Sequence, residues 1–211
     1  MLNSKKLLGI VKILTLVIAL ALSYTSVLAA NAGNIYTVAG NGSQSYAGDG
    51  GLATSATLND PSGIAVDSIG NLYIADQSNH CIRVVAKVSG TYLGMAMTAG
   101  NIYTIAGNGS WGYSGDGGAA TSATLRSPSG VALDSIGNLY IADFGNNRIR
   151  VVANVTGTYL GVAMTAGNIY TVAGNGNQSY AGDGGLASSA SLYLPYCVAV
   201  DSVGNLYIAD T

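Results

Sequence analysis

Ionisable side chains are scarce in this sequence of 211 residues, which has no glutamate, one histidine and only 9% charged residues. Eight lysines and arginines stand against ten aspartates, and no basic stripe runs along the chain. A nucleic-acid-binding protein needs such a stripe, because neutralisation of phosphates supplies most of its affinity. The composition therefore removes nucleic acid from the expected partners.

Residues that carry out catalysis or hold metals are equally few. His80 is the only histidine, so one chain cannot build a His-rich zinc site. No Ser–His–Asp set and no single-copy pair of carboxylates emerges. Cys81 and Cys197 occupy different positions of the repeat described below and form no repeating disulfide framework, although a bond between them stays open in an exported chain. We expect no enzyme activity, no metal and no cofactor.

The first thirty residues combine a basic start with an apolar run. Two lysines precede Leu7–Leu28, which Lys12 interrupts, and small residues end the run at Ala29 and Ala30. This pattern is typical of a secretory signal peptide, residues 1–30. The alternative is an uncleaved membrane anchor, which needs about 20 apolar residues, and Lys12 leaves too short a clean run.

We therefore predict a chain that is secreted, periplasmic or held at the cell surface, with no membrane span after processing. Removal of the signal peptide takes away three of the eight basic residues and none of the ten acidic ones, which leaves a net charge of −5.

The rest of the chain, residues 31–211, is a repeat with a period of 67 residues. The sequence that begins at Gly33 returns at Gly100 and Gly167, without insertion or deletion between the copies. We number these repeats 1 to 3, the third being truncated. The thirty glycines of the chain fall mainly in the turns of this repeat.

Each full repeat period contains four short apolar runs, rich in β-branched and aromatic residues and too short for helices. In the first blade these runs, named a to d, are Gly63–Val66, Leu72–Ala75, Ile82–Val85 and Ile102–Ala106. The turn between a and b needs Gly70 in the left-handed backbone conformation. Further strands are expected at Ile35–Ala39 (d), Cys197–Val200 (a) and Leu206–Ala209 (b).

This pattern resembles the NHL repeat. The residues that carry the resemblance in the first copy are Pro61, Gly63, Asp67, Gly70-Asn71, Tyr73, Asp76, Asn79 and Ile82. The second copy fits better, with Asn146-Asn147-Arg148-Ile149, whereas the first has Cys81 in place of the arginine. The resemblance implies an all-β fold, a β-propeller of four-stranded antiparallel blades, with two complete blades and partial blade strands in this chain. It leaves the function open, because the fold is a scaffold for many activities.

The period exceeds the 40–50 residues usual for a propeller blade. We interpret it as one blade with two long connections, 87–99 between c and d and 107–127 between d and the next a. Propellers often close by pairing an N-terminal strand with the last blade. Two blades and a part cannot make a ring, so we expect either a truncated sequence or several chains sharing one ring as a homo-oligomer.

Aspartates recur at the same place in every repeat, which favours a structural role over a catalytic one. One set, Asp67, Asp134 and Asp201, heads the a–b turns, and the other, Asp76, Asp143 and Asp210, ends strand b. We expect them to accept turn N–H groups or to pair with Arg83 or Arg150. The loops at 46–51, 113–118 and 180–185 lack the ligands of calcium loops and the lysine of phosphate loops. They are interpreted as tight turns leading into a helical turn near Ala53–Leu58.

Chemically large differences between the copies fall in or beside the d–a and b–c connections, which share one end of an up-and-down blade. The a–b turn at the opposite end is identical in the first two copies. We take the variable end as a recognition face, with drift in exposed loops as the alternative. Its candidate ligand-binding residues are Gln44, Asn59, Gln77, His80, Trp111, Arg126, Phe144, Asn147, Gln178 and Tyr193.

The sequence thus indicates a non-catalytic extracytoplasmic binding module for a protein or glycan ligand. Two alternatives remain. One is a fragment of a propeller hydrolase or lyase whose catalytic residues lie on blades outside this sequence. The other is a structural assembly element of a cell-surface protein.

Overall fold

The computed structural model describes residues 33–211. The architecture below belongs to the unit Val38–Thr211. The predicted signal peptide lies outside the described residues. Within the described part, no helix has the length and apolarity needed to cross a membrane.

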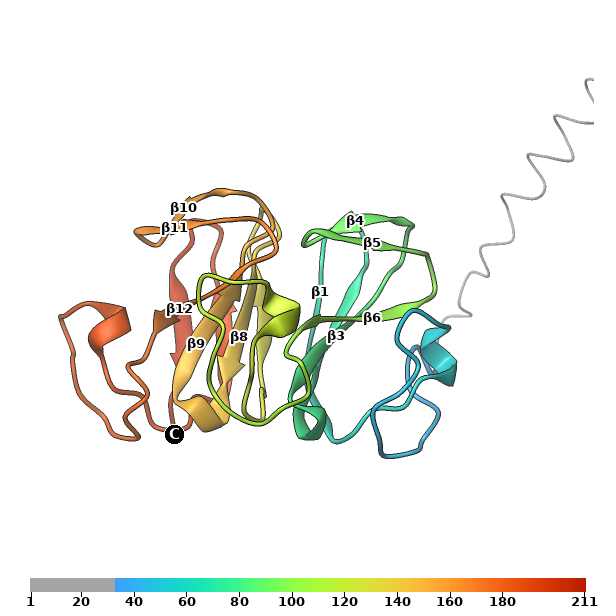
Figure 1. The fold of residues 1–211 in the computed structure, drawn as a ribbon, viewed down its shortest axis with the longest axis horizontal. Helices are drawn as coiled ribbons and strands as arrows, with labels where there is room; N and C mark the ends of the chain where they lie inside the picture. The colour runs from blue at the N-terminus through green and yellow to red at the C-terminus, as the bar shows by residue number, and fades with distance from the viewer. Residues whose placement is uncertain (1–32) are drawn as a thin grey trace, which may run out of the picture. The chain divides into compact units, whose positions relative to one another are not determined.

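Two complete four-stranded antiparallel blades and one pair of strands follow one another along the chain (Figure 1). Blade 1 comprises β1 (Pro61–Val66), β2 (Leu72–Asp76), β3 (Cys81–Val85) and β6 (Ile102–Ala106). Blade 2 comprises β7 (Val131–Leu133), β8 (Leu139–Asp143), β9 (Arg148–Val152) and β12 (Ile169–Ala173). Partial blade 3 consists of β13 (Cys197–Val200) and β14 (Leu206–Ala209). The predicted fold class is confirmed.

The connections carry short elements of their own. Between strands b and c lie the 3-10 helices η2 (Gln77–Asn79) and η4 (Phe144–Asn146). The connections before strand a contain η1 (Ala53–Ser55), η3 (Ala120–Ser122) and η5 (Ala187–Ser189). Between c and d, β4 (Gly90–Tyr92) pairs with β5 (Met95–Met97), and β10 (Gly157–Tyr159) pairs with β11 (Val162–Met164). These hairpins were not predicted, because three-residue strands give almost no periodic signal.

The expected strand at Ile35–Ala39 is wrong, since no strand forms over these residues. In the complete blades the equivalent segments, β6 and β12, gain their hydrogen bonds from the third strands β3 and β9. No third strand precedes Ile35 among the described residues. The apolar pattern alone was therefore not enough to form a strand.

Blades pack face to face, and each sheet has two distinct faces. On the forward face, turned toward the next blade, Tyr73, Ile82 and Val84 join a core that also takes in Leu139 and Ile141 of blade 2. On the backward face, Ile74 and Val85 belong to a separate cluster. This alternation follows from the period of two in a β-strand.

The innermost strands of neighbouring blades approach very closely. The Ser62 hydroxyl donates to Ser129 O (2.8 Å), and the Ser129 hydroxyl donates to Tyr196 O (2.6 Å), one repeat further on. A Cβ atom on Gly63 would lie only 2.3 Å from Ser129 O. Glycine is needed at this position because the backbone of the next blade occupies the space of a side chain.

The long connection before each complete blade covers the outer edge of that blade. Gly50 N donates to Ile102 O (2.8 Å), and Ile102 N donates to Gly51 O (2.9 Å), so the loop adds a rung to β6. Gly117, Gly118 and Ile169 repeat these bonds at β12. An edge covered in this way does not pair with another sheet.

Candidate functional site

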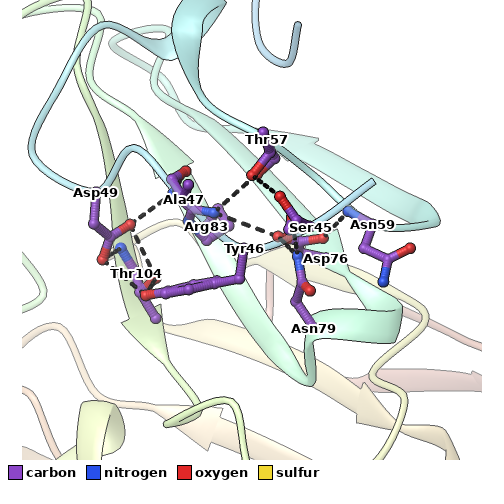
Figure 2. Close-up of polar contacts among 10 residues, drawn as sticks. All are labelled: Ser45, Tyr46, Ala47, Asp49, Thr57, Asn59, Asp76, Asn79, Arg83 and Thr104. Atoms are coloured by element: carbon purple, nitrogen blue, oxygen red, sulfur yellow. Dashed lines mark hydrogen bonds and ion pairs between the residues drawn. The ribbon is translucent and has the colours of Figure 1, made fainter. Parts of the chain in front are cut away.

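Each complete blade buries an arginine from its third strand. In blade 1, Arg83 is fully buried, with Nη2 2.7 Å from Asp49 Oδ1 and Nη1 3.4 Å from Asp76 Oδ2. The Tyr46 ring lies over the guanidinium, with 4.9 Å between its centroid and Cζ. The Tyr46 hydroxyl donates to Asp49, as Figure 2 shows. We call these three partners, the loop tyrosine, the loop aspartate and the strand aspartate, the arginine cage.

Blade 2 repeats the cage with the same geometry. Arg150 Nη2 lies 2.6 Å from Asp116 Oδ1, and Nη1 lies 3.4 Å from Asp143 Oδ2. The Tyr113 ring lies 4.9 Å from Cζ, and its hydroxyl donates to Asp116. The prediction that the aspartates ending strand b pair with arginine is confirmed for both complete blades.

The role of the glycine-rich loops was missed from the sequence. Beyond forming tight turns, the loops at 46–51 and 113–118 supply two of the three partners in each cage. The recurrence of a tyrosine three residues before an aspartate was the available signal. Sequence alone did not show that this pair reaches an arginine more than thirty residues away.

Burial sets the electrostatics of the cage. Removal from water raises the pKa of Asp143 to about 6, against hydrogen bonds from Asn146 and the Arg126 N–H and the charge of Arg150. The pKa of Asp76 is raised for the same reason. Arginine stays charged under all these conditions. The cage therefore attaches the long loop to the blade, because its charged groups form ion pairs with one another.

The a–b turns are also closed structural units. Asp67 Oδ1 accepts the N–H groups of Ile69 and Asn71, and Oδ2 accepts the Asn71 side chain and the Tyr73 hydroxyl. Gly70 has φ +93°, as the left-handed prediction requires. Between this turn and its copy at Asp134 lies a hollow of about 280 Å³. The carboxylates of Asp67 and Asp134 that line this hollow already accept hydrogen bonds from N–H groups of their own turns.

The opposite end of the blades carries aromatic residues, of which Trp111 and Tyr196 are exposed. Trp111 is 61% exposed, and the Arg126 guanidinium stacks on it at 4.2 Å from the ring centroid. Arg126 also lies against η4, because Gly145 N donates to its carbonyl oxygen. Phe144, the first residue of η4, meets Tyr196 edge to face, with the ring centroids 6.1 Å apart. We call Trp111, Arg126, Phe144 and Tyr196 the aromatic cluster.

Two predicted face residues serve another purpose. His80 Nδ1 accepts the N–H of Ser127 (3.2 Å), and Asn147 Oδ1 accepts the N–H of Leu194 (3.0 Å). Each bond joins the connection between strands b and c of one blade to the chain segment that leads into the next blade. Burial lowers the pKa of His80, which favours the neutral ring that this bond requires. His80 and Asn147 are thus links between blades.

The remaining candidates are spread along the same end. Gln44 and Gln178 are exposed and sit at the position of Trp111 in the other two loops, where all three residues form the same backbone bridge. Asn59 and Tyr193 donate their backbone N–H to Asp76 and Asp210. Gln77 begins η2, as Phe144 begins η4. The structure therefore brings Trp111, Arg126 and Phe144 together but leaves these five outside the cluster.

Tyr196 was missed although the sequence contained the signal. It occupies the position of Ser62 and Ser129, so it is as large a change between copies as the candidates that were chosen. The two cysteines are both free, Cys81 buried and Cys197 exposed. Burial raises the pKa of the Cys81 thiol to about 12.

Comparison with known proteins identifies the repeat. A model of the NHL repeat matches residues 58–85 and 125–152, which run from the end of the long loop to the third strand of each complete blade. The chain contains two NHL repeats. Both matched NHL segments include the a–b turn, the strand-ending aspartate and the caged arginine.

Several known proteins match part of this chain in sequence or in structure. Teneurin-1 of Homo sapiens is 34% identical over 113 residues, which is 48% of this chain and 4% of teneurin. Among solved structures, a protein of unknown function from Bacteroides thetaiotaomicron superposes with a TM-score of 0.57 and 22% identity, over 76% of this chain and 35% of that one. An auxiliary nutrient binding protein from Bacteroides ovatus gives 0.52 and 22%, over 75% and 36%. These structures support the propeller fold, and the chain spans about a third of their length.

Proposed function

We propose that this chain is a non-catalytic, extracytoplasmic binding module that holds a protein or glycan ligand at the variable end of its blades. The observation that carries the proposal is the aromatic cluster, in which an exposed tryptophan is stacked by Arg126 beside Phe144 and Tyr196. Aromatic residues and arginine contribute most interface energy, because they bury large areas with few rotatable bonds and still offer polar contacts.

Exposed side chains at this end are available to a ligand, whereas the charged groups of the cages and of the a–b turns are engaged. The cage residues are engaged with Arg83 and Arg150, and the turn aspartates with their own N–H groups. Trp111 and Tyr196 of the aromatic cluster are 61% and 51% exposed. Large exposed aromatic side chains gathered at one place mark interaction sites on soluble proteins.

Catalysis on blades outside this sequence is the second candidate function, together with a role in cell-surface assembly. Among residues 33–211 no group of three or more His, Cys, Asp or Glu side chains is arranged to hold a metal ion. The names of the structural neighbours do not decide between these functions, since likeness at 22% identity extends to the fold alone.

The test replaces two cluster residues by those that repeat 1 carries in the same positions. Trp111→Gln with Phe144→Gln is expected to leave the melting temperature nearly unchanged, because Gln44 and Gln77 already occupy these positions. Binding to a ligand found by pull-down or glycan array should weaken by about 2 kcal/mol or more.

The matched control is Gly137→Val at the other end, where φ is +83° and a Cβ would meet Asn154 at 3.0 Å. This variant should lose stability. Unchanged binding by the double glutamine variant would show that the cluster is not the ligand site, and unfolding would show that it belongs to the core.

Export is proposed on the composition of residues 1–30. N-terminal sequencing of the exported protein should begin at Ala30 or Asn31. Recovery of a chain with intact Met1 in the membrane would contradict it.

A further inference from the structure

Arg126 differs from the other arginines of the chain in that its charged group has no partner. Arg83 and Arg150 form ion pairs in their cages, and Arg148 donates to two backbone carbonyl oxygens at 2.9 and 2.8 Å. Among residues 33–211 no carboxylate or other acceptor takes a bond from the guanidinium of Arg126, which is an exposed residue. Its five N–H donors are therefore available to a ligand.

The Arg126 side chain is held in place although its charge is unpaired. Its backbone N–H donates to Asp143 Oδ1 (2.8 Å), and its carbonyl oxygen accepts the N–H of Gly145 (2.9 Å), which fixes the base of the side chain against η4. The guanidinium then stacks on Trp111, with 4.2 Å between Cζ and the ring centroid. A fork of donors that is ordered before binding loses less conformational freedom when a ligand arrives.

Three residues make this arrangement, and all three differ from their counterparts in repeat 1. Gly145 leaves room for the stem of Arg126, because a Cβ atom on residue 145 would overlap Arg126 Cγ. Trp111 provides the stacking surface. Repeat 1 has shorter or non-aromatic residues in the first two positions and a side chain in the third, namely Gln44, Asn59 and Ser78. The three differences fit one another, which independent drift in exposed loops does not explain.

The guanidinium and the aromatic surface beside it define the chemistry of the ligand. A planar fork of donors matches a carboxylate, which accepts two parallel N–H bonds. Trp111 is exposed next to this charge, and Tyr196 is exposed beside Phe144 of η4. A ligand that suits both features carries a carboxylate close to apolar or aromatic groups.

The neighbouring amide groups favour a polypeptide over a sugar. Asn146 donates to Gly112 O (2.7 Å) and to Asp143 (2.8 Å). Asn147 accepts the N–H of Leu194 (3.0 Å). The hydroxyl groups of a sugar would find these side chains engaged, and a polar group that is buried without a partner weakens binding. A polypeptide needs fewer polar partners, because it combines carboxylates with apolar side chains.

We infer, on the basis of the proposed function, that the variable end of blade 2 binds an acidic segment of a partner protein. An aspartate or glutamate of the segment pairs with Arg126, and apolar side chains next to it contact Trp111 and Tyr196. Recognition of acidic motifs by arginine is a known mode of peptide binding.

The first experiment finds out what the site binds. A phage library of random heptapeptides is selected on the full chain and counter-selected on the Arg126→Gln variant. The recovered peptides should contain aspartate or glutamate next to an aromatic or apolar residue. Recovery of neutral or basic peptides, or of none, would overturn the inference. Binding to a glycan array that Arg126→Gln abolishes would also overturn it, because the site would then hold a sugar.

Calorimetry with a recovered peptide measures the contact itself. Arg126→Gln should weaken binding about ten-fold or more, since a charge-assisted forked contact is lost. Arg126→Lys should lose a similar amount, because an ammonium group cannot form the fork. Replacement of the peptide's acidic residue by its amide should cause the same loss in the unmodified chain and no further loss in Arg126→Gln. Additive losses would show that the carboxylate contacts another group and would contradict the inference.

Gly145→Ser changes the position of the guanidinium and keeps its charge. It copies Ser78 of repeat 1, should displace Arg126 from Trp111 and should weaken binding several-fold with the melting temperature nearly unchanged. The matched control is Lys87→Gln, which removes one positive charge from an exposed residue of the c–d connection at the other end of the blade. It should bind like the unmodified chain. A loss equal to that of Arg126→Gln would overturn the inference, because net charge alone would then explain binding.

Two outcomes separate this inference from the function on which it rests. If Trp111→Gln with Phe144→Gln abolishes binding and Arg126→Gln does not, the aromatic cluster holds a ligand without an acidic contact. The inference is then wrong and the proposed function stands. If neither variant changes binding, both are wrong.

Discussion

At the scale of single residues, the caged arginines decide how the long loops are held. Arg150 bridges a half-exposed loop carboxylate, Asp116, and a fully buried strand carboxylate, Asp143. The buried partner matters most, because an unpaired charge in the protein interior is far more costly than one that water still reaches.

We expect Arg150→Met to destabilise the protein by about 3 kcal/mol or more, since Asp143 would stay buried without its charge partner. Urea denaturation measures the change. The double variant Arg150→Met with Asp143→Asn should recover part of the loss. A cost below about 1 kcal/mol for the single variant would show that the pair is not a main fastening of the loop.

His80 provides a pH-dependent link between blades that repeat 2 does not have. The folded state favours the neutral ring and lowers the pKa of His80 below its ordinary 6.5. Its contribution to stability is therefore fully present above pH 6.5 and decreases as the pH falls through the folded pKa, because only the unfolded chain gains the proton. His80→Asn copies the neutral acceptor Asn147 and should abolish this part of the pH dependence. Parallel unfolding curves for both proteins between pH 7.5 and about 5 would contradict the assignment.

At the scale of elements, the contact between the innermost strands of neighbouring blades restricts most strongly which residues the sequence can have. It needs a serine and a glycine, Ser62-Gly63 in blade 1 and Ser129-Gly130 in blade 2. Blade 3 has Tyr196-Cys197 in these positions. In the described part of the chain no further blade lies against the Cys197 side chain, which is exposed.

Gly130→Ala should cost about 1–3 kcal/mol, because the added Cβ would lie 2.8 Å from both Tyr196 O and Cys197 Cα. Cys197→Gly makes the reverse change in the same position of the exposed blade and should cost about 1 kcal/mol or less. Thermal unfolding of the two variants checks the contrast. Equal losses would mean that the close approach of blades 2 and 3 has no special energetic role.

At the scale of the whole molecule, apolar sheet surface remains uncovered in the described part of the chain. Ile64 and Val66 of the backward face of blade 1 are 66% and 60% exposed, and Tyr207 of blade 3 is 59% exposed. Such surface favours association. Pairing of two backward faces of blade 1 would cover Ile64 and Val66, and a two-fold contact of this kind closes at a dimer.

We therefore expect the chain to form dimers that Ile64→Ser with Val66→Thr shifts toward monomer, as measured by light scattering over a range of concentrations. These residues are exposed and the changes remove only apolar contact area. A chain that is monomeric and cooperatively folded at every concentration would contradict the expectation.

The repeat, the strands of the two complete blades and the turn glycines followed from the sequence alone, because each depends on local chemistry. Alternation of apolar residues sets a strand, and a left-handed turn position requires glycine whatever surrounds it. The same reasoning wrongly predicted a strand at Ile35–Ala39, because a strand also needs a neighbouring strand with which to form hydrogen bonds.

Only the tertiary structure decided which residues act together. Asp49 meets Arg83 across more than thirty residues, and His80 reaches Ser127 in the next repeat. Of the predicted face, Trp111, Arg126 and Phe144 form one cluster, to which the fold adds Tyr196. These groupings depend on how one blade packs on the next, and packing between distant segments leaves no periodic trace in the order of the residues.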